Sequence, residues 1–134
     1  MHPKYKEADR LSHEVIGAAI EVHRRLGPGL HESIYEKCLM RELELRGIPA
    51  ENQVVVQIEY KGKVFDEELR LDIFVGKCLA VELKAIEDVL PVHKAIEISY
   101  MQLLDAPVGL ILNFHVPMMV QGISRYILPG ANLE

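Results

Sequence analysis

The sequence contains few of the residues that mark several common classes of protein. It has two cysteines and no tryptophan among its 134 residues. Cys38 and Cys78 lack the spacing of a metal-binding or disulfide framework. No run of 18 or more apolar residues is present, and the first residues lack the apolar core of a signal peptide. We therefore expect a reduced, cytoplasmic protein that does not span a membrane.

An excess of basic residues is also absent. The chain has 15 Lys and Arg against 20 Asp and Glu, a net charge of −5. This balance argues against a broad surface for duplex nucleic acid, although bound divalent ions would offset clustered carboxylates and local basic patches can persist. With 49% hydrophobic and 26% charged residues, the chain is expected to fold as one globular domain over residues 1–134.

The periodicity of apolar residues predicts an α/β fold. Apolar residues at helical spacing predict helices over residues 8–25, 30–46 and 91–104. Alternating or continuous apolar residues predict strands over residues 53–60, 64–75, 79–84 and 108–114, with an edge strand over 122–128. The helix over 91–104 can serve as a crossover between parallel strands. We therefore expect an antiparallel three-strand unit and a further parallel strand in one mixed sheet flanked by helices.

Three ionisable residues interrupt two of the predicted strands. Asp72, Glu82 and Lys84 are surrounded by apolar residues, and burying an unpaired charge costs several kcal/mol. One explanation is a structural ion pair between Lys84 and a carboxylate. The other is a divalent cation held by Asp72 and Glu82, with Lys84 directed at a substrate phosphate or an attacking water. Periodicity alone leaves both explanations open.

The length of the connection between these strands decides whether the two carboxylates can meet. A two-residue turn would pair Asp72 with Val81 and point Glu82 away from Asp72. A three-residue connection would pair Val75 with Leu79 and therefore Asp72 with Glu82. We predict a three- or five-residue connection or a β-bulge, with Asp72, Glu82 and Lys84 on one face.

A motif in the second predicted helix adds a resemblance to a known family. Gly29-Leu30-His31-Glu32-Ser33-Ile34-Tyr35 matches the signature Gly-x-x-Glu-x-x-Tyr of the small GxxExxY proteins. These proteins are assigned to the PD-(D/E)xK nuclease-like superfamily, whose core is a restriction-endonuclease-like α-β-β-β-α-β fold. The resemblance extends over nearly the whole chain and includes the segments Tyr60-Lys61-Gly62, Leu71-Asp72, Val81-Glu82-Leu83-Lys84-Ala85 and Pro91-Val92-His93.

This resemblance implies a metal-dependent nuclease acting on DNA or RNA. It implies Asp72 and Glu82 as metal ligands, with the Leu83 carbonyl as a third. Glu32 would be a further ligand or a carboxylate that positions water, and Lys84 would activate water or stabilise charge on the phosphate. Mg²⁺, or Mn²⁺ in its place, suits such an all-oxygen site. The implied chemistry is metal-assisted phosphodiester hydrolysis.

Four further residues have both a functional and a structural interpretation. Tyr35, His23, His93 and Tyr100 fall in segments that match the family and are candidates for binding substrate. Each can instead be a packed side chain with a local hydrogen bond. The six histidines show no zinc-type spacing.

The chain departs from the related sequences at one position. Related proteins often carry Gln four residues before a Tyr on the helix after the Glu-x-Lys strand, whereas Ile96 precedes Tyr100 here. Glu97 lies about 100° further round the helix and is not expected to replace that Gln. This departure favours an alternative, an inactive nucleic-acid- or protein-binding module that kept the fold. The low basic content also fits a hydrolase of small phosphodiesters or nucleotides, and a homodimer is left open.

Overall fold

The chain folds into a five-stranded mixed sheet with the strand order β1-β2-β3-β4-β5. The computed structural model describes residues 1–134. Its strands are β1 (Ala50–Tyr60), β2 (Lys63–Val75), β3 (Leu79–Lys84), β4 (Val108–Asn113) and β5 (Ile123–Ile127). Its helices are α1 (Tyr5–Leu26), α2 (Glu32–Leu45), α3 (Pro91–Leu103) and the short 3-10 helix η1 (Met119–Gly122).

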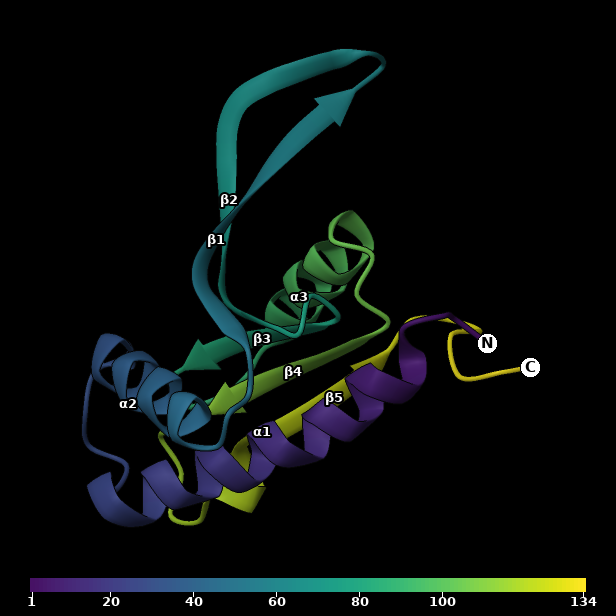
Figure 1. The fold of residues 1–134 in the computed structure, drawn as a ribbon. Coiled ribbons are helices and arrows are strands. Elements are labelled where there is room, and N and C mark those ends of the chain that lie inside the picture. Colours follow the sequence, from purple (N-terminus) through teal and green to yellow (C-terminus); the bar gives the residue numbers. More distant parts are fainter.

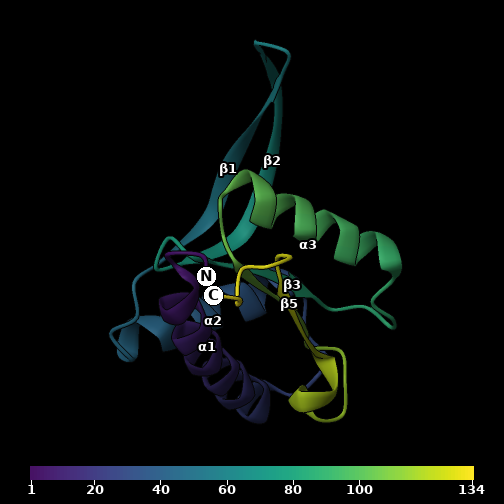
Figure 2. The ribbon, with the colours of Figure 1, turned by 90° about the vertical axis from the view of Figure 1, so that its right-hand side faces the viewer.

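Helices cover both faces of the sheet, as Figures 1 and 2 show: α1 and α2 lie on one face and α3 lies on the other. Between the sheet and the first two helices lies a core of 20 buried residues, in which α1 contributes Val15 and α2 contributes Leu39. A smaller cluster of seven buried residues lies under α3 and includes Tyr100, Met101 and Ala80. This arrangement confirms the predicted restriction-endonuclease-like α/β fold.

One connection in the sheet joins parallel strands. β3 pairs with β4 in parallel, and α3 makes the crossover between them, whereas all other neighbouring strands are antiparallel. Both strands are almost entirely buried because each is covered by helices on two faces. The predicted topology is therefore confirmed, including the edge strand at the end of the chain.

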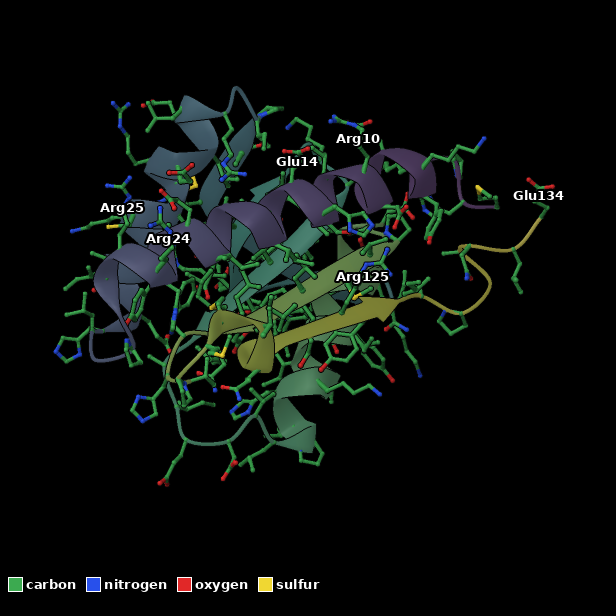
Figure 3. All side chains as sticks on the ribbon, turned by 90° about the horizontal axis from the view of Figure 1, so that it is seen from below. Arg10, Glu14, Arg24, Arg25, Arg125 and Glu134 are labelled. Atoms are coloured by element: carbon green, nitrogen blue, oxygen red, sulfur yellow. The ribbon has the colours of Figure 1, made fainter.

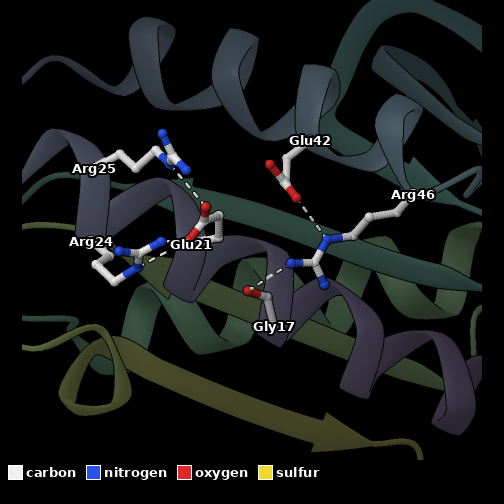
Figure 4. Close-up of polar contacts among 6 residues, drawn as sticks. All are labelled: Gly17, Glu21, Arg24, Arg25, Glu42 and Arg46. Atoms are coloured by element: carbon white, nitrogen blue, oxygen red, sulfur yellow. Dashed lines mark hydrogen bonds and ion pairs between the residues drawn. The ribbon is translucent and has the colours of Figure 1, made fainter.

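Arginine side chains fix α1 against its neighbours. Arg46, which caps α2, donates to Glu42 on its own helix and to the carbonyl of Gly17 on α1 (Figure 4). Arg125 on β5 reaches across to α1, as Figure 3 shows, where it pairs with Asp9 and donates to Ser12. These contacts join α1 to α2 and to β5.

The orientation of α3 differs from the helical face expected from the sequence. Apolar residues from Ala95 to Leu103 predict one buried side that includes Ile96. In the structure, Glu97, Tyr100 and Met101 face the sheet, while Ile96 and Leu103 are 44% and 47% exposed. The prediction was right for Tyr100 and wrong for Ile96 and Leu103, because the rotation of a helix is set by its tertiary packing rather than by its average apolar face. None of the α-helices is both long and apolar enough to cross a membrane.

Candidate metal centre

The connection between β2 and β3 has the length that the carboxylates require. Val75 pairs with Leu79, so Gly76, Lys77 and Cys78 form a three-residue connection. Gly76 and Lys77 both adopt positive φ angles, 57° and 56°, which turn the chain sharply. The predicted register is therefore confirmed, and its continuation brings Asp72 opposite Glu82.

Asp72 and Glu82 lie where the ladder between β2 and β3 ends, and each carboxylate binds the backbone of the other strand. The Asp72 backbone N–H donates to Glu82 Oε1 at 2.8 Å. The Leu83 backbone N–H donates to Asp72 Oδ2, also at 2.8 Å. Glu82 Oε2 accepts no hydrogen bond within the chain, and Asp72 Oδ1 accepts only a long 3.5 Å bond from Gln53. Each carboxylate therefore keeps an oxygen available to an external ligand.

Burial and mutual repulsion make this pair of carboxylates unusually basic. Glu82 is only 8% exposed, and burial, followed by the charge of Asp72, raises its pKa to about 7. Burial also raises the pKa of Asp72, and the neighbouring carboxylates of Glu36 and Glu32 add to the shift. A bound cation would favour the ionised form of both groups. The electrostatics and the all-oxygen donors therefore fit a hard divalent cation.

Lys84 ends β3 on the same side of the strand as Glu82, two residues away. Its side chain is half-buried and takes part in none of the ion pairs of the structure. The explanation of these charges as a structural ion pair with Lys84 is therefore wrong. Backbone N–H groups bind the carboxylates instead, which leaves the Lys84 ammonium free to contact another group.

Glu32 belongs to the helical layer of α1 and α2, on the other face of the sheet from α3. It is the first residue of α2, and its Oε1 accepts a hydrogen bond of 3.2 Å from the backbone N–H of Ala85, just after β3. Its charge contributes to the raised pKa of both Asp72 and Glu82. No three His, Cys, Asp or Glu side chains converge closely enough to form a metal cluster by themselves. The role of Glu32 as a ligand stays a prediction.

Tyr35 supports the loop that precedes Glu32. Its ring is fully buried and stacks on Phe114, with centroids 4.3 Å apart and planes inclined by 11°. Its hydroxyl donates to the carbonyl of Gly27 at 2.5 Å and accepts from the N–H of Leu30 at 3.1 Å. These contacts favour the structural interpretation, in which the Tyr of the motif fixes the loop that presents its Glu.

The other candidate substrate residues also have local partners. His23 is buried, with Nε2 2.9 Å from the carbonyl oxygen of Val116. His93 accepts from the backbone N–H of Leu90 and so caps α3. Tyr100 donates to the carbonyl of Arg70 at 2.8 Å, two residues before Asp72 on β2. Burial raises the pKa of Tyr100, and the charges of Glu82 and Asp72 add to the shift.

The interpretation of the sequence missed a third acidic residue beside the pair, Glu97 on α3. Glu97 is fully buried, and neither of its carboxylate oxygens has a hydrogen-bond partner. It lies above Gly109 of β4, where an added Cβ would come within 3.2 Å of its Oε2. Burial raises the pKa of Glu97 well above its usual value, and Glu82 and Asp72 raise it further. A Glu inside an apolar helical segment, with a Gly on the strand that follows, was the available signal.

Comparison with known proteins identifies the family. A model of the PD-(D/E)XK nuclease superfamily matches residues 9–126. The chain therefore belongs to the PD-(D/E)XK nuclease superfamily.

Comparisons with individual proteins and solved structures add less about this chain than the family model does. No curated protein matches the chain. Among solved structures, the crystal structure of SSO0001 is similar, with 24% sequence identity and a TM-score of 0.48. The match covers 70% of this chain and 47% of the chain of SSO0001, so this chain corresponds to about half of that protein.

Proposed function

We propose that the protein is a divalent-metal-dependent phosphodiester hydrolase that cleaves nucleic acid. The observation that carries the proposal is the arrangement at the ends of β2 and β3. Asp72 and Glu82 face each other across the two strands. Glu82 accepts from the backbone N–H of Asp72, Asp72 accepts from the backbone N–H of Leu83, and Lys84 is unpaired beside them. Membership of the nuclease superfamily supports the same conclusion.

The residues present fit an Mg²⁺ ion, or Mn²⁺ in its place. Asp72 and Glu82 would hold the ion, with the carbonyl of Leu83 as a third donor and Glu32 as a further ligand or a group that orients water. Carboxylate and carbonyl oxygens are the donors that Mg²⁺ prefers. The ion would supply Lewis-acid chemistry, polarising a phosphodiester oxygen and acidifying the attacking water.

The side chains of the protein supply the remaining steps. The ammonium of Lys84 would contact the scissile phosphate and stabilise the negative charge that develops on it. Glu32, held at Ala85 by a hydrogen bond, would accept a hydrogen bond from the attacking water and orient it. Tyr100 would keep β2 in place through its bond to the carbonyl of Arg70. In this account the site residues come from both helical layers and meet at the end of the sheet.

A nuclease assay with matched variants tests the proposal. The purified protein is incubated with Mg²⁺ or Mn²⁺ and with single- or double-stranded DNA or RNA. We expect cleavage that EDTA abolishes and that Asp72→Asn lowers by at least about a hundredfold. Exposed Glu14 on α1 offers a control, because Glu14→Gln should leave cleavage unchanged. If the protein binds nucleic acid but cleaves it with neither Mg²⁺ nor Mn²⁺, this result would contradict the proposal and favour a binding module that kept the fold.

A further inference from the structure

The outer half of the β1–β2 hairpin extends beyond the rest of the molecule, as Figures 1 and 2 show. No helix covers this part of the sheet, and its side chains are mostly exposed. Even so, it carries apolar and aromatic residues: Tyr60 is 62% exposed and Phe65 is half-buried. An isolated two-stranded ribbon is only marginally stable, so aromatic residues at its tip suggest a binding role.

The strand register places the aromatic residues on one face of this hairpin. Tyr60 pairs with Lys63, and paired residues share a face. Phe65 follows Lys63 by two residues, and the Lys63 ammonium lies 5.3 Å from the centre of its ring. The Lys61 ammonium lies 5.4 Å from the centre of the Tyr60 ring. Two aromatic rings and two ammonium groups therefore form one surface, which we call the tip surface.

Two of the four acidic residues of the outer hairpin, Glu59 and Glu68, lie on the face opposite the tip surface. Glu59 pairs with Val64 on the opposite face. Glu68 pairs with Gln57, also on that opposite face, and it forms an ion pair with Arg70. The other two acids, Asp66 and Glu67, are exposed where the register shifts, and Glu67 follows Phe65 by two residues on the side of the tip surface. The tip surface therefore carries the two ammonium groups of Lys61 and Lys63 beside its rings, with Glu67 at its edge.

The tip surface lies on the same side of the sheet as the carboxylate pair. Val54 and Val56 alternate with Tyr60 along β1, and both pack in the cluster under α3. Ala80 belongs to the same cluster, and Glu82 and Lys84 follow it by two and four residues on β3. The hairpin also curves toward the side on which α3 lies (Figure 1). A polymer on the tip surface would therefore approach the face that carries Glu82 and Lys84.

We propose that the tip surface binds an unpaired segment of nucleic acid, with bases stacked on Tyr60 and Phe65 and phosphates contacted by Lys61 and Lys63. The inference rests on the proposed function and specifies its substrate. Stacking on aromatic rings requires bases that are not already stacked in a duplex. Two lysines are also too few for the broad basic face that a duplex needs, but they suit a single strand. A cation beside each ring matches the alternation of phosphate and base along such a strand.

Fluorescence anisotropy with labelled oligonucleotides tests this inference, with Ca²⁺ in place of Mg²⁺ to limit cleavage. We expect the wild type to bind a single strand at least about tenfold more tightly than the matching duplex. Tyr60→Ala should weaken single-strand binding at least about fivefold. The double variant Lys61→Glu/Lys63→Glu should weaken it further and lower the slope of log K against log salt by about 1.4. Lys77→Glu, at the exposed β2–β3 turn, is the matched control and should change neither quantity.

The outcomes separate this inference from the proposed function. If the wild type cleaves nucleic acid and the tip variants bind and cleave as it does, the inference fails while the proposed function stands. If the wild type neither binds nor cleaves any nucleic acid, both fail. If the tip variants convert a dimer to a monomer in sedimentation while single-strand affinity is unchanged, the tip surface joins two copies of the chain and the inference is overturned. Circular dichroism confirms that each variant is folded before it is used.

Discussion

Replacing Lys84 with alanine is expected to lower turnover by at least about a hundredfold while leaving divalent-cation affinity unchanged. Lysine is not a ligand for Mg²⁺, and Lys84 makes no ion pair that the substitution could break. Its ammonium is expected to act on the phosphate, so its loss should appear in kcat rather than in metal binding. Single-turnover cleavage and Mn²⁺ calorimetry on the same preparation measure the two effects.

Two further variants make this result specific to Lys84. Lys37→Ala on α2 removes an exposed lysine away from β3 and should leave turnover unchanged. Lys84→Arg keeps the charge but changes its shape, so it should recover part of the lost activity. Equal cleavage by the wild type and Lys84→Ala would exclude the role that we assign to Lys84. A loss of metal affinity together with turnover would show that the substitution disturbs the carboxylate pair itself.

Replacing Glu97 with methionine is expected to stabilise the protein by about 1–3 kcal/mol at neutral pH, because a buried carboxyl group without a hydrogen-bond partner is destabilising. Its oxygens have no hydrogen-bond partner, and methionine fills a similar volume without a polar group. Urea unfolding of wild type and variant at several pH values measures the difference. Glu14→Met on the exposed face of α1 is the control and should change stability little.

The effect of Glu97 should depend on pH with a definite sign. Burial raises the pKa of Glu97 in the folded protein, so the native state retains a proton that the unfolded chain has lost. The free energy of unfolding should therefore fall as pH rises above about 4.5. Glu97→Met should reduce that slope. The pH dependence that remains in the variant comes from Glu82 and should end near pH 7, where the raised pKa of Glu82 lies. If the free energy of unfolding of the wild type were constant from pH 5 to pH 8, this would contradict the raised pKa values of Glu97 and Glu82.

The register at the carboxylate pair could be predicted from the sequence because it follows from counting residues. Faces alternate along a strand, so the length of the Gly76–Cys78 connection alone decides whether Asp72 meets Glu82. Strand and helix types could be predicted for the same reason, since each has its own period. These features depend on residues that are close in sequence.

Glu97 could not be predicted in the same way because its burial depends on a distant glycine. The apolar residues of α3 suggested that Ile96 would face inward, whereas the helix turns Glu97 and Met101 toward β4. The rotation is possible because Gly109 leaves space that any side chain would fill. The bonds from backbone N–H groups to Asp72 and Glu82 were also missed. They arise only where two strands diverge, which no local sequence pattern records.

Calorimetric titration with Mn²⁺ most directly tests the central claim that Asp72 and Glu82 form a divalent-cation site. We expect the wild type to bind Mn²⁺, and to bind it more tightly at pH 8 than at pH 6, because the pKa of Glu82 is raised to about 7 and the proton competes with the ion. Asp72→Asn and Glu82→Gln should each abolish binding, while Glu14→Gln should retain it. Absence of Mn²⁺ binding by the wild type at millimolar concentrations, or equal binding by Asp72→Asn, would contradict the account.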